Sequence, residues 1–149
     1  MREYEQYKFQ LIREGEMPVP CILIMPFRAN ADSPVELRLQ EEGKGTYLSE
    51  YANFAAALTE GKILLLADLR GLGETTDPAF YTDAKYWNRE YRNAMVSMHI
   101  GRPIMGQRVV DILTLLDFCS EHRISERTPR QGICQWYLWS GCNSCCLFG

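Results

Sequence analysis

Cysteine thiols are the first side chains in this sequence whose type and spacing could do chemistry. Four of the six cysteines lie in the uncharged C-terminal stretch QGICQWYLWSGCNSCCLFG, namely Cys134, Cys142, Cys145 and Cys146. Thiolates bind zinc, and a C-x-x-C pair can also cycle between thiols and a disulfide. A structural zinc site commonly draws four ligands from two such pairs, whereas this stretch contains one, Cys142 with Cys145. The spacing therefore argues against a metal or redox site, and we expect the chain to use no cofactor.

A second candidate group lies in the segment DLRGLGETTDP, which contains Asp68, Arg70, Gly71 and Gly73. Glycines permit backbone conformations that other residues avoid, so this segment fits a tight turn. The Asp68 and Arg70 side chains could hold the turn by hydrogen bonds to loop amides and carbonyls, and we favour this structural interpretation. A dinucleotide-binding fingerprint is the competing functional interpretation, but Thr76 stands in place of its third glycine.

Composition and charge exclude several classes of protein. The net charge of −3 and the pI near 5.4 do not fit the basic surface of a nucleic-acid-binding protein. No apolar stretch reaches the roughly 20 residues that a membrane span needs, and the N-terminus lacks the order of a secretory signal. We therefore expect a soluble, cytoplasmic chain with reduced thiols. Cys21 and Cys119 lie in apolar runs and are expected to be buried as small hydrophobic residues.

The elements that must position these groups begin with three strands. YEQYKFQLI and VPCILIMP are joined by REGEMP, whose glycine and proline favour a turn, so they predict an antiparallel hairpin. SPVELRLQ alternates and predicts a third strand, which the loop EEGKG ends. From Tyr47 to Glu60, apolar residues recur at spacings of three and four, which predicts one amphipathic helix with Gly61 as its left-handed C-cap.

The following segments predict a crossover and a buried helix. KILLLADL begins with a continuous apolar run, as in a parallel strand covered on both faces, and completes a βαβ unit. The segment GRPIMGQRVVDILTLLDFCSEH predicts a helix with Pro103 in its first turn. Its apolar side carries Met105, Val109, Ile112, Leu113 and Leu116, and its narrow polar stripe carries Gln107, Asp111 and Thr114. We expect this helix to be largely buried against the sheet and to be followed by another strand.

This order of elements resembles the N-terminal half of an α/β-hydrolase domain, in particular the acetyl xylan esterase and cephalosporin deacetylase-like esterases. The resemblance covers roughly residues 1–129, and its most specific pieces are DLRGLGET and GRPIMGQRVVDILTLLDF. It implies an α/β fold with an incomplete α/β-hydrolase-like sheet: an N-terminal antiparallel hairpin, a βαβ unit and a buried helix. It also implies a carboxylic-ester hydrolase whose full-length relative acts on an acetylated saccharide. Residues 130–149 form an atypical tail rich in cysteine and tryptophan.

The resemblance places one oxyanion-hole amide in the loop EEGKG, Glu41 to Gly45, with Gly43 and Lys44 as the candidate residues. The competing interpretation is a solvated loop, and we expect the Lys44 ammonium to point into water. The nucleophile, the acid and the histidine would all follow LDFCSEH. Ser140 lies in LWSGC, without the first glycine of G-x-S-x-G, and His99 and His122 both precede it, so a complete triad cannot be assembled. His99 fits a structural or surface role better than that of a base.

The tail also fits a change of reading frame near Pro129 and Arg130. Tryptophan has the single codon TGG, so reading one nucleotide later converts Trp136 and Trp139 into two glycines three positions apart. One of many allowed readings, VKVYANGTYGPVVIHAACL, has the pattern of a strand, a glycine turn and a helix. We therefore hypothesise that the chain is a truncated, inactive fragment with an out-of-frame tail. In the restored frame, the Tyr137 codon can encode only threonine or isoleucine, so G-x-S-x-G would lack its serine if that codon marks the nucleophile position. The codons still permit a serine at the adjacent position.

Two other functions stay open on the sequence alone. The chain could be a small binding or interaction module whose cysteine-rich tail binds metal. The aromatic residues Tyr81, Tyr86, Trp87 and Tyr91 could instead bind a partner or stack on sugars, although a surface helix that covers the domain explains them better. A truncated parallel sheet would expose an unpaired edge and the apolar side of its last helix, so we expect self-association through the sheet edge.

Overall fold

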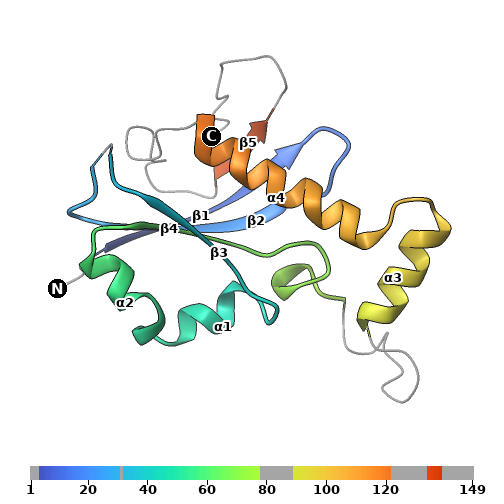
Figure 1. The fold of residues 1–149 in the computed structure, drawn as a ribbon, viewed down its shortest axis with the longest axis horizontal. Helices are drawn as coiled ribbons and strands as arrows, with labels where there is room; N and C mark the ends of the chain where they lie inside the picture. The colour runs from blue at the N-terminus through green and yellow to red at the C-terminus, as the bar shows by residue number, and fades with distance from the viewer. Residues whose placement is uncertain (1–3, 31, 78–88, 122–133, 139–149) are drawn as a thin grey trace.

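The computed structural model describes residues 4–30, 32–77, 89–121 and 134–138, which form a mixed sheet with helices on both faces (Figure 1). The sheet has five strands in the order β3-β4-β2-β1-β5. Their bounds are β1 Tyr4–Arg13, β2 Val19–Pro26, β3 Val35–Leu39, β4 Ile63–Ala67 and β5 Cys134–Leu138. The helices are α1 Lys44–Ser49, α2 Ala52–Thr59, α3 Arg89–His99 and α4 Ile104–Glu121, and a short 3-10 turn, η1, spans Gly73–Thr75. α1 and α2 cover one face of the sheet, and α4 covers the other.

The predicted N-terminal hairpin is confirmed. β1 and β2 pair antiparallel, from Tyr4 opposite Pro26 to Leu11 opposite Val19. Gly15 has a φ of 76° in the connecting turn, a conformation that glycine adopts without strain. β2 then pairs antiparallel with β4, so the hairpin joins the parallel part of the sheet through β2.

The predicted βαβ unit is also confirmed. β3 pairs parallel with β4, with Val35 opposite Ile63 and Leu39 opposite Ala67. α1 and α2 connect the two strands along the chain. All five residues of β4 are buried, as expected for a strand that is covered on both faces.

The helix of this unit is broken in two, so the single helix expected over Tyr47–Glu60 is wrong. Glu50 is extended, with φ −116° and ψ 110°, and ends α1. The Tyr47 hydroxyl donates to the Asn53 carbonyl at 2.6 Å, and the Asn53 side-chain amide donates to the Tyr47 carbonyl at 3.1 Å. These reciprocal bonds stabilise the corner between α1 and α2. Gly61 follows α2 with a φ of 73°, which confirms the predicted left-handed C-cap.

Alternate residues of the central strands fill two cores, one on each face of the sheet. On the face that α4 covers, the core includes Phe9, Leu11, Cys21, Leu23, Ile63, Leu65, Leu115 and Phe118. On the other face it includes Ile22, Ile24, Leu64 and Leu66, which pack with Tyr47, Phe54 and Leu58 of α1 and α2. Burial of these side chains from both sides is the main stabilising contribution to the sheet.

The predicted orientation of α4 is wrong. Four residues expected to face the sheet are 48–66% exposed: Met105, Val109, Leu113 and Leu116. The buried residues of α4 are Asp111, Thr114, Leu115 and Phe118. Asp111 and Thr114 were expected in a stripe facing solvent, but they bind Arg70 and Arg13 on the sheet side. Because buried polar groups must be hydrogen-bonded, these contacts set the rotation of the helix.

The two edges of the sheet are β5 and β3 in the described part of the chain. A strand was predicted after α4, and β5 follows α4 but pairs parallel with β1. β3 carries an ion pair between Glu36 and Arg38, and Lys62 Nζ lies 3.6 Å from Glu36 Oε2. Charged side chains on an edge strand disfavour the addition of a further strand. Among the described helices, none combines the length and the apolar composition that a membrane crossing requires.

Candidate functional site

The carboxyl ends of β3 and β4 bring together the two glycine-containing segments singled out in the sequence. In open α/β sheets, this edge is where ligands bind. Gly43 precedes α1 with a φ of 92°, and Gly73 begins η1 with a φ of 53°. The two backbones lie so close that a Cβ on Gly43 would stand 2.4 Å from the Gly73 Cα. A side chain fits at neither position, which explains why both residues are glycine.

Asp68, directly after β4, accepts hydrogen bonds from both loops. Its Oδ1 accepts from the Lys44 backbone N–H at 2.7 Å, and its Oδ2 accepts from the Glu74 backbone N–H at 2.9 Å. Lys44 Nζ lies 2.7 Å from Asp68 Oδ2 and 3.1 Å from Glu74 Oε1. The Asp68 and Lys44 side chains are 1% and 3% exposed, whereas Glu74 is 64% exposed. These three residues, called the Asp68 cluster below, tie the loop before α1 to the turn after β4.

The expectation that the Lys44 ammonium points into water is wrong. A buried ammonium is costly unless it is paired, and here two carboxylates pair with it. The Lys44 backbone N–H is bound by Asp68, and the Gly43 N–H donates to the Gln40 carbonyl at 3.2 Å. Both amides of the expected oxyanion loop are therefore bonded within the chain in this conformation.

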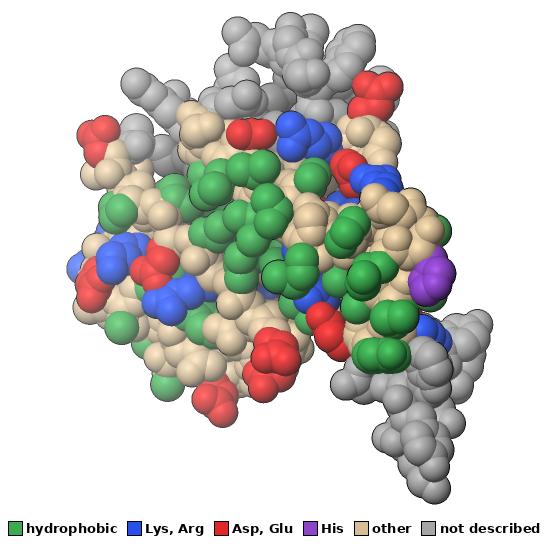
Figure 2. Space-filling model, turned by 45° about the vertical axis from the view of Figure 1, so that its right-hand side comes forward, with side chains coloured by type: hydrophobic (Ala, Val, Ile, Leu, Met, Phe, Trp, Pro, Cys, Tyr) green, Lys and Arg blue, Asp and Glu red, His purple; other side chains and the backbone are tan. Residues whose placement is uncertain are grey.

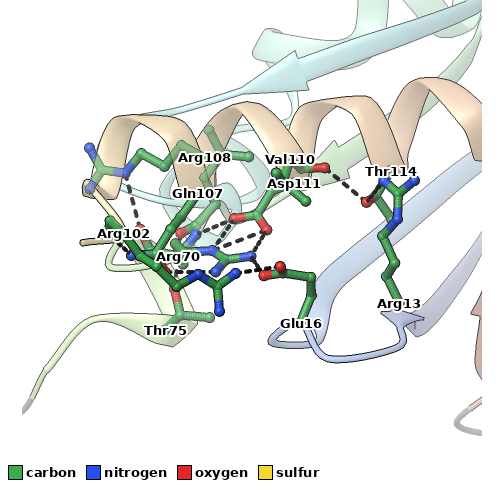
Figure 3. Close-up of polar contacts among 11 residues, drawn as sticks. Arg13, Glu16, Arg70, Thr75, Arg102, Gln107, Arg108, Val110, Asp111 and Thr114 are labelled. Carbon is green, nitrogen blue, oxygen red and sulfur yellow. Dashed lines mark hydrogen bonds and ion pairs between the residues drawn. The ribbon is translucent and has the colours of Figure 1, made fainter. Parts of the chain in front are cut away.

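Arg70 connects the same turn to α4 on the other face of the sheet (Figure 3). Its Nε lies 2.9 Å from Asp111 Oδ2 and its Nη2 lies 2.5 Å from Asp111 Oδ1. Nη1 donates to Gln107 Oε1 at 2.8 Å, and Nη2 donates to Glu16 Oε2 at 3.0 Å. Two-point contacts between guanidinium and carboxylate are strong and orient both groups. These four residues, Glu16, Arg70, Gln107 and Asp111, are called the Arg70 cluster below.

The electrostatics of the Arg70 cluster follow from these contacts. Hydrogen bonding to Asp111 raises the pKa of Arg70 above its ordinary value. Burial by itself would raise the pKa of Glu16, but hydrogen bonds from Arg70 and Arg102 outweigh burial and lower the pKa. A general acid or base works best with a pKa near the operating pH. Both pKa values are shifted away from neutral pH, so these groups stay charged and are not suited to transferring protons.

Arg108 fastens α3 and the turn to α4. Its Nε donates to the Arg70 carbonyl at 3.1 Å, and its Nη1 and Nη2 bind the Glu90 carboxylate of α3 at 2.7 Å and 3.0 Å. The same pairing lowers the pKa of Glu90. Gly71 lies against this guanidinium with a φ of 80°, and a Cβ there would stand 3.3 Å from Arg108 Nη2. The turn after β4 is therefore held from both faces of the sheet.

The other residues singled out in the sequence do not join these clusters. His99 ends α3, is exposed, and has its Nδ1 2.7 Å from the Met95 carbonyl oxygen. Cys21 is buried as predicted, Cys119 is partly buried, and burial raises the pKa of both thiols. Cys134 begins β5, and Tyr91 of α3 is 48% exposed. The remaining ones lie outside the described residues: Tyr81, Tyr86, Trp87, His122, Ser140, Cys142, Cys145 and Cys146.

No metal site is present among the described side chains, since no three His, Cys, Asp or Glu residues gather to hold an ion. The ion pairs Lys44–Asp68 and Arg70–Asp111 were missed from the sequence. One sequence signal does point to these ion pairs: a charged residue lies inside or directly after an apolar run, as in VVDILTLL and ILLLAD. Such a residue is expected to be buried, and a charged side chain is buried only when it is paired. The partner could not be identified, since Arg70 and Asp111 are 41 positions apart.

The backbone of this chain resembles that of a solved structure. The sequence matches no protein-family model and no curated protein. The crystal structure of a proposed acetyl xylan esterase from Bacteroides fragilis superposes on it with a TM-score of 0.64 and 14% sequence identity. The likeness covers 81% of this chain and 36% of that one, so this chain spans about a third of the length of that protein. The likeness shows the fold, which is an incomplete α/β-hydrolase-like fold.

Proposed function

We propose that this chain is the structural framework of a protein related to carboxylic-ester hydrolases and that it does not hydrolyse esters by itself. The observation that carries this proposal is the backbone likeness to the Bacteroides fragilis protein. The order β3-β4-β2-β1 and the braced turn after β4 support it, because they form the part of the sheet on which such a site would be built. An acetylated saccharide is the proposed substrate class of a full-length relative.

Ester hydrolysis by this fold requires groups that the described residues do not supply. An activated nucleophile attacks the carbonyl, two amides stabilise the oxyanion, and water then releases the acyl group. The amides of Gly43 and Lys44 are bonded within the chain. His99 is exposed and its ring contacts a carbonyl of its own helix. These observations support a chain without esterase activity.

We further propose that residues 130–149 are translated out of frame. The support comes from the codons of Trp136 and Trp139, which encode glycine when the frame is read one nucleotide later. In a hydrolase-like sheet, a strand and a glycine turn are expected at this place in the chain. The position of β5 adds to this support. It pairs with β1 and leaves β3, the edge of the parallel part of the sheet, without a further strand among the described residues.

Labelling with an alkyl fluorophosphonate tests the absence of an activated nucleophile. This reagent phosphonylates serines that a neighbouring base has activated. We expect the intact mass of the chain to stay unchanged, because Ser140 lacks the context of a nucleophile turn. A stoichiometric adduct that disappears in Ser140→Ala would refute the proposal, and denatured chain provides the control for non-specific reaction.

A further inference from the structure

The end of α3 and the outer side of α4 present hydrophobic side chains to solvent (Figure 2). The residues are Met98, Ile100, Met105, Val109, Leu113 and Leu116, each 48–66% exposed. The four on α4 are spaced by four, four and three residues, so they lie in one line along the helix. These six residues are called the apolar stripe below.

The contacts beneath α4 keep the apolar stripe on the outside. Asp111 and Gln107 bind the Arg70 guanidinium, and Thr114 accepts from Arg13 Nη1 at 3.3 Å. Turning the stripe toward the sheet would withdraw Asp111 and Gln107 from Arg70, so that the buried guanidinium would keep only Glu16 of the contacts described above. The exposure of the stripe is therefore a consequence of the fold and cannot be relieved by rotating the helix.

We propose that the apolar stripe is the interface of a two-fold symmetric dimer of this chain. Monomeric proteins rarely expose contiguous apolar patches above a few hundred Å². Each partner in a standard interface buries about 800 Å², and six large aliphatic side chains that are about half exposed or more supply a major part of this area. An anionic lipid surface is a poor occupant, because the chain carries a net charge of −3.

The charges beside the stripe favour an antiparallel arrangement of the two α4 helices. Arg102, 51% exposed, binds Glu16 near the N-terminal end of α4. Asp117, 52% exposed, lies 3.8 Å from Arg13 near the C-terminal end. Glu16 and Arg13 belong to the same end of the β1–β2 hairpin, so Arg102 and Asp117 flank the stripe on the same side. In a two-fold dimer, each Arg102 then lies near Asp117 of the other copy, and the opposed helix dipoles add to the attraction.

Light scattering coupled to size-exclusion chromatography, and sedimentation over a concentration series, test this dimer on the full chain. We expect a particle of twice the 17.2 kDa chain mass. The variant Val109→Glu/Leu113→Glu should weaken self-association at least about tenfold, because it places charges in the interface. Met17→Glu/Phe27→Glu is the matched control, since it adds the same charge at two other exposed hydrophobic residues and should leave the dimer intact. Circular dichroism verifies that each variant is folded.

Exchanging the flanking charges tests the antiparallel arrangement. Arg102→Glu should weaken the dimer, and Arg102→Glu/Asp117→Arg should restore it. A monomer at all concentrations would overturn the proposal, as would a monomer that binds neutral or anionic vesicles through the stripe. A dimer unaffected by Val109→Glu/Leu113→Glu would also overturn it and would place the interface elsewhere on the chain. The inference does not depend on the proposed function, because no catalytic measurement bears on it.

Discussion

Replacing Asp68 with asparagine removes the acceptor at the centre of the Asp68 cluster. Three donors converge on this carboxylate: the Lys44 N–H and Nζ, each at 2.7 Å, and the Glu74 N–H at 2.9 Å. An asparagine amide offers one oxygen and turns an NH₂ group toward at least one of these donors. Among the described residues, the Lys44 ammonium, 3% exposed, then keeps Glu74 as its one charged partner. Removing one member of a buried ion pair costs about 3–5 kcal/mol, a large part of the roughly 5–15 kcal/mol that stabilises a domain.

A double-mutant cycle on Lys44 and Asp68 measures this pairing by urea denaturation at constant protein concentration. Lys44→Met leaves Asp68 with two backbone donors, so we expect a smaller loss of about 2 kcal/mol. Asp68→Asn should cost about 1.5–3 kcal/mol less in the Lys44→Met background than alone, because no buried ammonium is then left unpaired. Losses that add within about 0.5 kcal/mol would refute the cluster as described. Lys62→Met, at a surface ion pair, is the control and should change stability by less than about 1 kcal/mol.

Three further substitutions test the contacts around the turn. Gly73→Ala should lower the free energy of unfolding far more than Gly15→Ala. A Cβ at Gly73 would stand 2.3 Å from Asp68 Oδ2, whereas a Cβ at Gly15 would have nothing within 4 Å, and equal losses would contradict this. Asp111→Asn should cost about 3 kcal/mol in the same assay, whereas Glu60→Gln, at the exposed Lys62–Glu60 pair, should cost under about 1 kcal/mol. A reversed order would refute the Arg70 cluster. Because the pKa of Glu16 is lower in the folded chain, its contribution is present above the unfolded pKa of about 4.3 and is lost as the pH falls through the folded pKa. Glu16→Gln should therefore lower stability at pH 7 and show a weaker acid dependence below about pH 4, and an unchanged pH profile would contradict this.

The strands could be predicted from the sequence because their signals are local. The alternation of polar and apolar residues in YEQYKFQLI indicates a strand with one face toward solvent. The continuous apolar run in KILLLADL indicates a strand that is covered on both faces, and the turn residues between segments indicate how the strands connect. The left-handed conformation of Gly61 follows from its place after a helical pattern. These parts of the fold need no information about distant residues.

The orientation of α4 and the burial of Lys44 could not be predicted, because both depend on contacts between distant residues. Hydrophobic periodicity places Met105 and Val109 on the buried side, but the pairing of Asp111 with Arg70 turns the helix the other way. Lys44 lies in a polar, glycine-containing loop that suggests solvent, and its partner Asp68 comes 24 positions later. The break between α1 and α2 likewise rests on a pair of side-chain bonds that no propensity indicates.

The hydrolysis of 4-nitrophenyl acetate by the purified full chain tests whether this framework hydrolyses esters. We expect a rate that rises linearly with substrate and does not exceed that of an equal concentration of denatured chain. We also expect the same rate in Ser140→Ala. Saturable turnover by the folded chain, lost on denaturation or in Ser140→Ala, would show that this framework carries a working nucleophile and would refute the proposed function.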